Sequence, residues 1–376
     1  KRFFKSRFCA KLTKDKINIR KKGVISKGII CPFIREGDDL VSIVVNSILE
    51  QQIGDRDVIG ITESVVARSQ GNYVTVDDIA KDIENKFGKN STIYVLYPIY
   101  SRNRFSMILK GIARTASKII LVMSLYDEVG NIVKEHPFTN MDYDDYYREI
   151  CKSEKCDCTI LSDIELDYHL ETLPADYKKN ILYCGLHNWE DAKNGWITVF
   201  SNDIVFSLAD ICSDKCDWGL LGSNKVSEER LKLFPTKLGA QNICDSVKSI
   251  IKEKTGKDVI VCIYGDGCFK DPVSEIWEFA DPITMPAYTD KELLESTPNE
   301  IKLKSLIDNC KNDSDIRFEL ENKELNLKGN MKSMGTTPRL YRDLLASLMD
   351  LTSGSGDRET PVILIQNYFN NEREKI

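Results

Sequence analysis

The chain has 376 residues, of which 42% are hydrophobic, and its formal net charge is −6. This length allows a large buried core and favours about two domains, or one elaborated domain. The acidic balance argues against nucleic-acid binding, because a surface for the phosphate backbone needs a clustered excess of Lys and Arg. No stretch reaches the roughly 18 apolar residues of a membrane span, so we expect a cytoplasmic protein without a membrane partner.

The first part of the chain alternates strand and helix patterns. Residues 17–30 predict two short strands and a turn, and Asp38 or Asp39 can cap the helix that starts at Leu40. Residues 57–62 form a predicted strand, followed by a short helix that Gly71 ends. A capping box at Thr75 predicts a helix to residue 87. A strand over 92–97, a helix over 101–116 and a strand over 118–125 follow, with a turn at 127–131. This alternation predicts an α/β fold.

In the second part of the chain, the alternation of strand and helix patterns is first irregular and then clear again. Residues 141–214 predict an insertion with short strands near 181–184 and 196–200. A helix over 236–254 leads into a β-branched strand that starts at Val259. Beyond it we expect a helix over 290–310, a polar hinge over 312–330, a helix over 338–351 and a buried strand over 361–366.

The strand at Val259 ends in Gly265-Asp266-Gly267, and this ending is the main candidate for chemistry. A buried strand of this kind delivers its last side chain to the carboxyl edge of a sheet, where ligands bind in open α/β folds. Asp266, Asp271 and Glu275 supply the oxygen donors that Mg²⁺ or Mn²⁺ prefer. The alternative is a Gly turn followed by a solvated acidic loop.

Two further stretches could contact phosphate. The helix that begins near Ser64 directly follows a strand, so its first N–H groups and the Arg68 guanidinium could face an anion; a solvated arginine is the alternative. The Gly/Ser loop over 352–357 lacks the Lys-Ser/Thr of a P-loop, and a plain linker explains it better.

The cysteines admit a zinc site as a minor hypothesis. Cys151, Cys156 and Cys158 lie near His169, Cys184 and His187 in the sequence, and Cys212 and Cys216 follow. No Cys-x-x-Cys pair is present, so we expect reduced, buried thiols instead.

Four stretches in order resemble one known family. They are Pro32-Phe33-Ile34-Arg35-Glu36-Gly37-Asp38-Asp39-Leu40, then Ser64 to Gly71, then Asp217-Trp218-Gly219-Leu220-Leu221-Gly222-Ser223-Asn224, and finally the helix and strand that end at Gly265-Asp266-Gly267. Together they resemble the coenzyme F420-0:L-glutamate ligases, the γ-glutamyl ligases of deazaflavin biosynthesis. The resemblance covers about half of the chain.

This resemblance implies a GTP-dependent amide ligation with Mn²⁺ or Mg²⁺, and K⁺ as a further candidate ion, on a small carboxylate and an amino acid. It implies a homodimer as well. Asp266 and Arg68 would be catalytic. Asp266 would hold metal, and Asp217, Asp214 or a carboxylate from residues 271–281, such as Asp271 or Glu275, would complete the metal site. The residues implied at the nucleotide are Arg35, Ser64, Arg68, Gln70, Gly71, Ser223 and Asn224.

The same resemblance implies mixed sheets with flanking helices, in an α/β (α+β) arrangement of four parts. Residues 1–140 would be an N-terminal nucleotide-binding part, 141–214 an insertion, 215–290 the second part of the ligase-like core with the acidic loop, and 291–376 a helical extension with a final strand. Leu221 stands where the family has a metal-binding Asp, and Leu cannot ligate a cation. A non-catalytic protein of the same fold that binds a nucleotide or a phosphorylated ligand is therefore the alternative.

Overall fold

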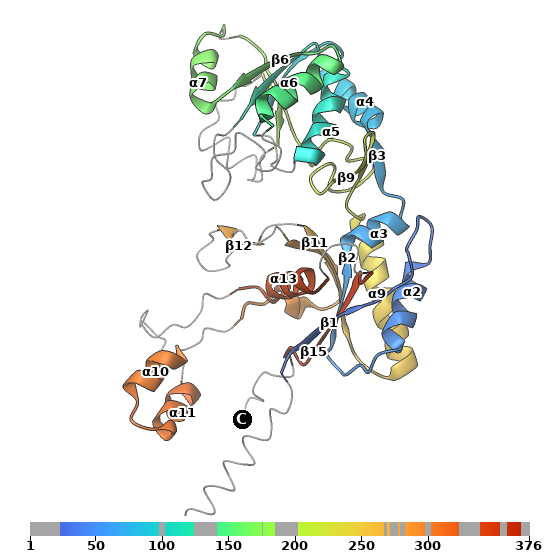
Figure 1. Cartoon of the computed structure of the whole chain (residues 1–376), viewed down its shortest axis with the longest axis vertical. Coiled ribbons are helices and arrows are strands. Elements are labelled where there is room, and N and C mark those ends of the chain that lie inside the picture. The colour runs from blue at the N-terminus through green and yellow to red at the C-terminus, as the bar shows by residue number, and fades with distance from the viewer. Residues whose placement is uncertain are drawn as a thin grey trace, which may run out of the picture. The chain divides into compact units, whose positions relative to one another are not determined.

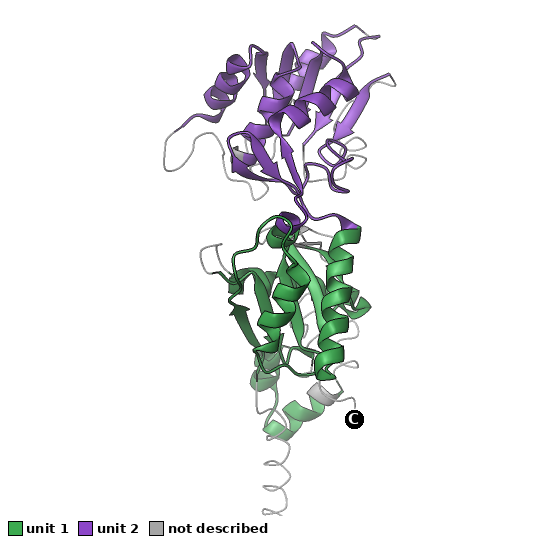
Figure 2. Cartoon of the chain, turned by 90° about the vertical axis from the view of Figure 1, so that its right-hand side faces the viewer, with its two compact units in different colours: residues 1–66, 238–376 green, residues 67–237 purple. Residues whose placement is uncertain are grey.

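A computed structural model describes residues 23–97, 102–123, 141–174, 176–184, 202–266, 269–270, 277–278, 283–297, 302–322, 339–353 and 359–369. The chain forms two compact units, one of residues 1–66 and 238–376 and one of residues 67–237 (Figure 2). We call them unit 1 and unit 2. Unit 1 is built from both ends of the sequence, and the four consecutive parts expected from the sequence stay predictions.

Unit 1 contains a mixed sheet of five strands. Its order is β1 (Ile25–Ile29), β15 (Val362–Gln366), β2 (Val58–Thr62), β11 (Ile260–Asp266) and β14 (Ile283–Tyr288). Only β2 and β11 run parallel to each other, and the other neighbours pair antiparallel. The helices α2 (Leu40–Leu49) and α9 (Lys237–Thr255) cover one face, and α13 (Tyr341–Ser353) covers the other (Figure 1).

The uninterrupted apolar run of β11 follows from this double cover. Val261 and Ile263 pack against α2 and α9, whereas Cys262 and Tyr264 pack toward α13. A strand that is buried on both faces needs apolar side chains at every position. On the neighbouring strand, the Met349 side chain of α13 fills the space that a Cβ at Gly60 would take.

Unit 2 contains a parallel sheet of five strands. Its order is β6 (Asp157–Leu161), β5 (Lys118–Val122), β4 (Thr92–Leu96), β7 (Asn180–Tyr183) and β8 (Ile204–Ser207). Counted within this sheet, the order is 3-2-1-4-5, as in doubly wound folds. The helices α4 (Val76–Phe87), α5 (Arg102–Ala113) and α6 (Tyr143–Ser153) pack on one face, and α7 (Asp163–Glu171) packs on the other. The strands on both sides of residue 140 therefore belong to one sheet.

Smaller elements complete the two units. The strands β3 (Tyr73–Thr75), β10 (Arg230–Lys232) and β9 (Asn224–Ser227) form an antiparallel sheet in unit 2, and β12 (Phe269–Lys270) pairs with β13 (Trp277–Glu278) in unit 1. The short helix α3 spans Glu63–Ser69. Unit 1 also has the 3₁₀ turn η1 (Lys291–Leu294) and the helices α10 (Leu303–Asn309) and α11 (Asp313–Glu321). None of the helices in the described ranges combines the length and apolar composition needed to cross a membrane.

The α/β prediction is confirmed, and so are several local signals. Asp39 caps α2 by accepting a hydrogen bond from the Ser42 N–H group, and Thr75 and Asp78 form the predicted capping box of α4. The long helix over 290–310 is wrong, because η1 ends at Leu294 and Ser296 forms a β-bridge with Leu340. The hinge over 312–330 is wrong where α11 stands. The predicted turn over 127–131, the strand over 196–200 and most of the loop over 352–357 lie outside the described residues.

Candidate functional site

The carboxyl ends of β2 and β11 lie side by side and carry two acidic residues. The register pairs Thr62 with Tyr264, so Glu63 follows β2 at the level of Gly265. Asp266 is the last residue of β11 and pairs with Ile283 of β14. The two strands run in parallel next to α3 (Figure 1), which puts both acids at the sheet edge where open α/β folds bind ligands.

Glu63 is the functional candidate that sequence reasoning missed. It is only 4% exposed, and a Cβ at Gly265 would lie 2.0 Å from the Glu63 Cγ atom. The Glu63 side chain therefore lies against β11 at Gly265, where only glycine leaves room. A buried carboxylate is costly unless it is paired or holds a cation. The signal was present in the sequence, since Glu63, like Asp266, comes at the end of a buried strand.

The structure shows where the predicted phosphate-binding residues lie on α3. Ser64 lies in the first turn and is half-buried, and Arg68 lies exposed in the last turn. The Arg68 guanidinium makes no hydrogen bond or ion pair with any described residue. Its charge there complements the negative end of the helix dipole, which is a structural explanation for it. Gly71, with φ of +66°, ends the helical segment as predicted.

Gln70 and Asp217 hold the start of α9. The Thr236 N–H group donates to Gln70 Oε1 at 3.1 Å, and the Lys237 N–H group donates to Asp217 Oδ2 at 2.7 Å. These are N–H groups that a helix start leaves without a partner inside the helix. Asp217, predicted as a metal ligand, thus has a capping role. The Gln70 Nε2 atom is buried and donates to no described residue.

Ser223 and Asn224 lie where a packed turn leads into β9. Ser223 is fully buried, and its Oγ donates to the Leu220 carbonyl at 2.8 Å. Asn224 begins β9 and pairs with Lys232. Arg104 on α5 donates to the Ser223 carbonyl at 3.0 Å. The Ser223 hydroxyl is therefore used by the fold.

Of the remaining predicted site residues, one lies in a surface turn and the others are placed only in part or lie outside the described residues. Arg35 is exposed, and its backbone N–H donates to Asp38 Oδ2 at 2.6 Å in the turn before α2. Asp271 and Glu275 lie outside the described residues, and Asp266 is placed by its backbone alone. Their predicted roles as metal ligands stay predictions.

The described residues do not form the zinc site that the cysteines suggested. Among them, no group of three or more His, Cys, Asp or Glu side chains is arranged to hold a metal ion. The cysteines described are free thiols, and His169 Nε2 lies 3.0 Å from the Tyr94 hydroxyl. His187 lies outside the description.

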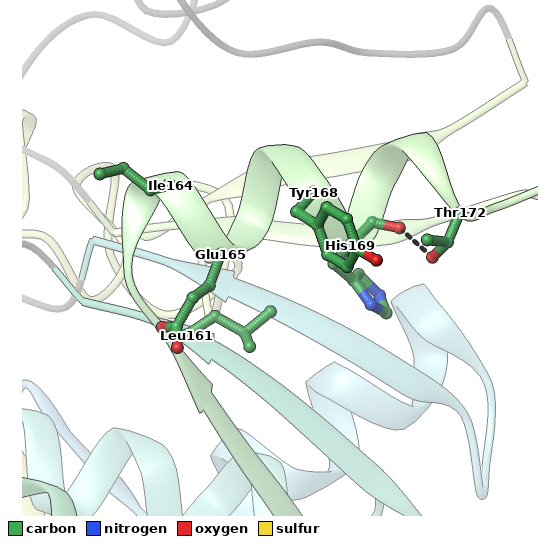
Figure 3. A pocket seen from close by; sticks show the side chains of 6 residues that line it. All are labelled: Leu161, Ile164, Glu165, Tyr168, His169 and Thr172. Atoms are coloured by element: carbon green, nitrogen blue, oxygen red, sulfur yellow. Dashed lines mark hydrogen bonds between the residues drawn. The ribbon is translucent and has the colours of Figure 1, made fainter.

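A hollow of about 490 Å³ lies beside α7 in unit 2 (Figure 3). Two of the polar side chains that line it make hydrogen bonds at the ends of α7. Glu165 accepts hydrogen bonds from the Ser162 N–H group and hydroxyl at 2.7 and 2.8 Å, and the Thr172 hydroxyl donates to the His169 carbonyl at 2.6 Å. Burial lowers the pKa of His169, with Lys118 adding to the effect. The remaining lining is Leu161, Ile164 and Tyr168, so the hollow offers little for catalysis.

The profile of one family, F420-0:gamma-glutamyl ligase, matches residues 28–367. The chain belongs to this family. The match extends from β1 to the end of β15, and it therefore includes both units and the carboxyl ends of β2 and β11. The resemblance seen in the motifs is thus confirmed over most of the chain. No curated protein matches the sequence.

Proposed function

We propose that this γ-glutamyl ligase family member is a metal-dependent, GTP-using ligase that joins glutamate, or another amine, to an unidentified small carboxylate. One observation supports the proposal most. Glu63 and Asp266 stand at the ends of two neighbouring parallel strands, and Gly265 leaves the space that Glu63 occupies. Two acids that end neighbouring parallel strands at the ligand edge of a sheet offer the carboxylate oxygens that a divalent cation prefers.

The residues at this edge fit a hard divalent ion such as Mn²⁺ or Mg²⁺, because the donors are carboxylate oxygens. Glu63 and Asp266 would hold it, and Asp271 and Glu275, which lie between β12 and β13 in the sequence, are the proposed further ligands. Such an ion, when bound, neutralises charge on the phosphate oxygens as phosphoryl transfer proceeds.

In the proposed reaction, the carboxylate oxygen of the acceptor attacks the γ-phosphorus of GTP, and GDP leaves. The amine then attacks the carbonyl carbon of the acyl phosphate, so that a C–N bond forms and phosphate leaves. Arg68 suits the phosphates, because its guanidinium is exposed and has no partner among the described residues. The buried Gln70 Nε2 is a second available donor.

The test is GTP turnover with Mn²⁺, glutamate and a panel of small carboxylates. Asp266→Asn and Glu63→Gln keep the side-chain shape and remove a metal-binding charge, so each should lower turnover by about 100-fold or more. Glu253→Gln is the matched control, since Glu253 is an exposed carboxylate on α9 of the same unit. Metal-dependent turnover that survives Asp266→Asn would refute the assignment.

The non-catalytic alternative also has an observation in its favour. Leu221, at the family's metal-binding Asp position, has an apolar side chain that is 37% exposed. Titration calorimetry distinguishes the two functions, because GTP that binds with Mn²⁺ but is never turned over identifies a binding protein. In either case Arg68→Ala should weaken GTP affinity by ~1–3 kcal/mol if the guanidinium contacts phosphate. Unchanged affinity would return Arg68 to the helix-dipole explanation.

Three further properties are part of the proposal. We expect a homodimer, which sedimentation velocity tests directly. We expect a cytoplasmic enzyme, which fractionation of cells that produce it would check. A stimulation of turnover by K⁺ over Na⁺ would support K⁺ as the additional ion.

A further inference from the structure

Three cysteines gather where α6 meets the edge strand β6 in unit 2. Cys151 lies in the last turn of α6 and is fully buried, and Cys158 is the second residue of β6 and is half-buried. Between them the chain reverses through Lys155, whose φ is +62°, and the Cys156 N–H group donates to the Cys151 carbonyl at 2.9 Å. All three thiols belong to or pack against the same core cluster.

The three thiols are not equivalent. The thiols of Cys151 and Cys158 interact directly, and this contact raises the pKa of Cys151 and lowers that of Cys158. Burial opposes the lowering at Cys158, nearby Arg148 adds to it, and Asp144 acts against it. This contact favours a thiolate at the half-buried Cys158 over one at the fully buried Cys151.

Cys156 differs from both. It is 5% exposed, its Sγ lies 3.5 Å from the Asp157 carbonyl, and burial is the main cause that raises its pKa to about 12. A thiol that is buried and protonated reacts slowly. The reactive position is therefore the half-buried Cys158, with Cys151 as the thiol placed to complete a bond to it.

We propose that Cys158 and Cys151 form a peroxide-oxidised thiol pair that closes a disulfide between α6 and β6. The Cys158 thiolate attacks one oxygen of a hydroperoxide, the O–O bond breaks, and a proton from solvent converts the leaving group to the alcohol or water. The Cys158 sulfenic acid that results is attacked by Cys151, which forms the S–S bond and releases water. The two thiols together lose two protons and two electrons, and the peroxide takes them up as it is reduced. The pair is independent of the ligase chemistry proposed above.

The experiment uses the full chain, reduced and then treated with hydrogen peroxide at one to ten equivalents. Alkylation of the remaining thiols and peptide mass mapping should find a 151–158 link that is lost on reduction. Cys310 serves as the internal reference, since it is also partly exposed but burial, Glu319 and Asp315 raise its pKa. We expect Cys158 to react at least about tenfold faster than Cys310.

Variants identify the role of each thiol. Cys158→Ser should abolish the link, and Cys151→Ser should leave a Cys158 sulfenic acid that dimedone traps. Cys156→Ser should keep the link, which makes it the matched control within the cluster. The proposal is overturned if the unmodified chain shows no 151–158 link, if the link runs to Cys156, or if Cys158 reacts no faster than Cys310. These mapping results come from the unaltered protein, so they stand even if a variant misfolds.

Discussion

The two five-stranded sheets of this protein are assembled in different ways. The parallel sheet of unit 2 comes from a nearly consecutive series of strands and helices, and every pair of neighbouring strands except β4 and β7 is consecutive in the chain. The mixed sheet of unit 1 joins segments that are far apart in the sequence. Its edge strand β1 pairs with β15, and Ile25 lies opposite Gln366. Only the second arrangement puts the ends of β2 and β11 together, and those ends carry the acids that we assign to the metal.

The two sheets also differ in the charged residues at their strand ends. In unit 2, Lys179 and Asp203 precede β7 and β8, and their side chains are only 2% and 0% exposed. Their Nζ and Oδ2 atoms are 3.0 Å apart, so the pair neutralises itself at the amino ends of the strands. In unit 1, Glu63 has another acid, Asp266, as its neighbour at the carboxyl ends. The Lys179–Asp203 pair therefore serves the fold, whereas the acids that end β2 and β11 are the candidates for a cation.

Breaking the ion pair of unit 2 should give the largest effect on stability. Asp203→Asn leaves Lys179 buried without its counter-charge, which should cost ~3–5 kcal/mol of unfolding free energy. Urea denaturation followed by circular dichroism measures this loss. The double variant Lys179→Met with Asp203→Leu should recover most of it, because removing both charges removes the desolvation penalty. A loss below ~1 kcal/mol in the single variant would contradict the structural role.

A side chain at Gly265 tests the crowding in unit 1. Gly265→Ala would force the Glu63 side chain out of its place, since the new Cβ would lie 2.0 Å from Glu63 Cγ. Overpacking of this kind costs ~1–3 kcal/mol, and we expect GTP turnover to be lost with it. Gly54→Ala is the control, because its Cβ would lie 3.5 Å from the nearest atom, an ordinary contact. Full turnover in Gly265→Ala would show that Glu63 has no part in the site.

The contrast between the sheets also explains what the sequence could predict. Local signals identified β2, β11, the cap at Asp39 and the capping box at Thr75, because each depends on neighbouring residues. The position of β15 between β1 and β2 depends on pairing across more than 300 residues, for which the chain has no local signal.

The same limit applies to Asp217 and to the region near the C-terminus. The hydrogen bond by which Asp217 caps α9 joins residues 20 positions apart, so the sequence pattern that suggests a metal ligand gives no sign of the cap. The helix expected over 290–310 fails because long-range pairing takes over its middle. Ser296 bridges to Leu340, and the Tyr341 N–H group donates to the Glu295 carbonyl at 2.9 Å. Tertiary pairing thus overrode a helical pattern.

Asp217→Ala separates capping from metal binding. If its carboxylate serves only the start of α9, the substitution should cost ~1 kcal/mol of stability and leave Mn²⁺ affinity unchanged. Thermal unfolding and metal titration on the same sample give both values. Asp214→Ala is the matched control, since Asp214 is also an exposed aspartate before α9 and accepts no hydrogen bond among the described residues. A loss of Mn²⁺ binding in Asp217→Ala alone would restore Asp217 as a metal ligand.

The smallest effect concerns the start of α4 and its dependence on pH. The pKa of Asp78 is lowered, chiefly by the hydrogen bond from the Thr75 backbone N–H at 2.8 Å. A carboxyl group whose pKa is lowered by folding stabilises the protein above the unfolded pKa of ~4, and this contribution is lost as the pH falls through the lowered value. Asp78→Ala should therefore cost ~0.5 kcal/mol at pH 7 and less at pH 3. Thermal unfolding at both pH values measures this difference. Glu84→Gln, on the exposed side of the same helix, is the control and should cost the same at pH 7 and pH 3. If Asp78→Ala also costs the same at both pH values, the charge of Asp78 does not contribute to stability.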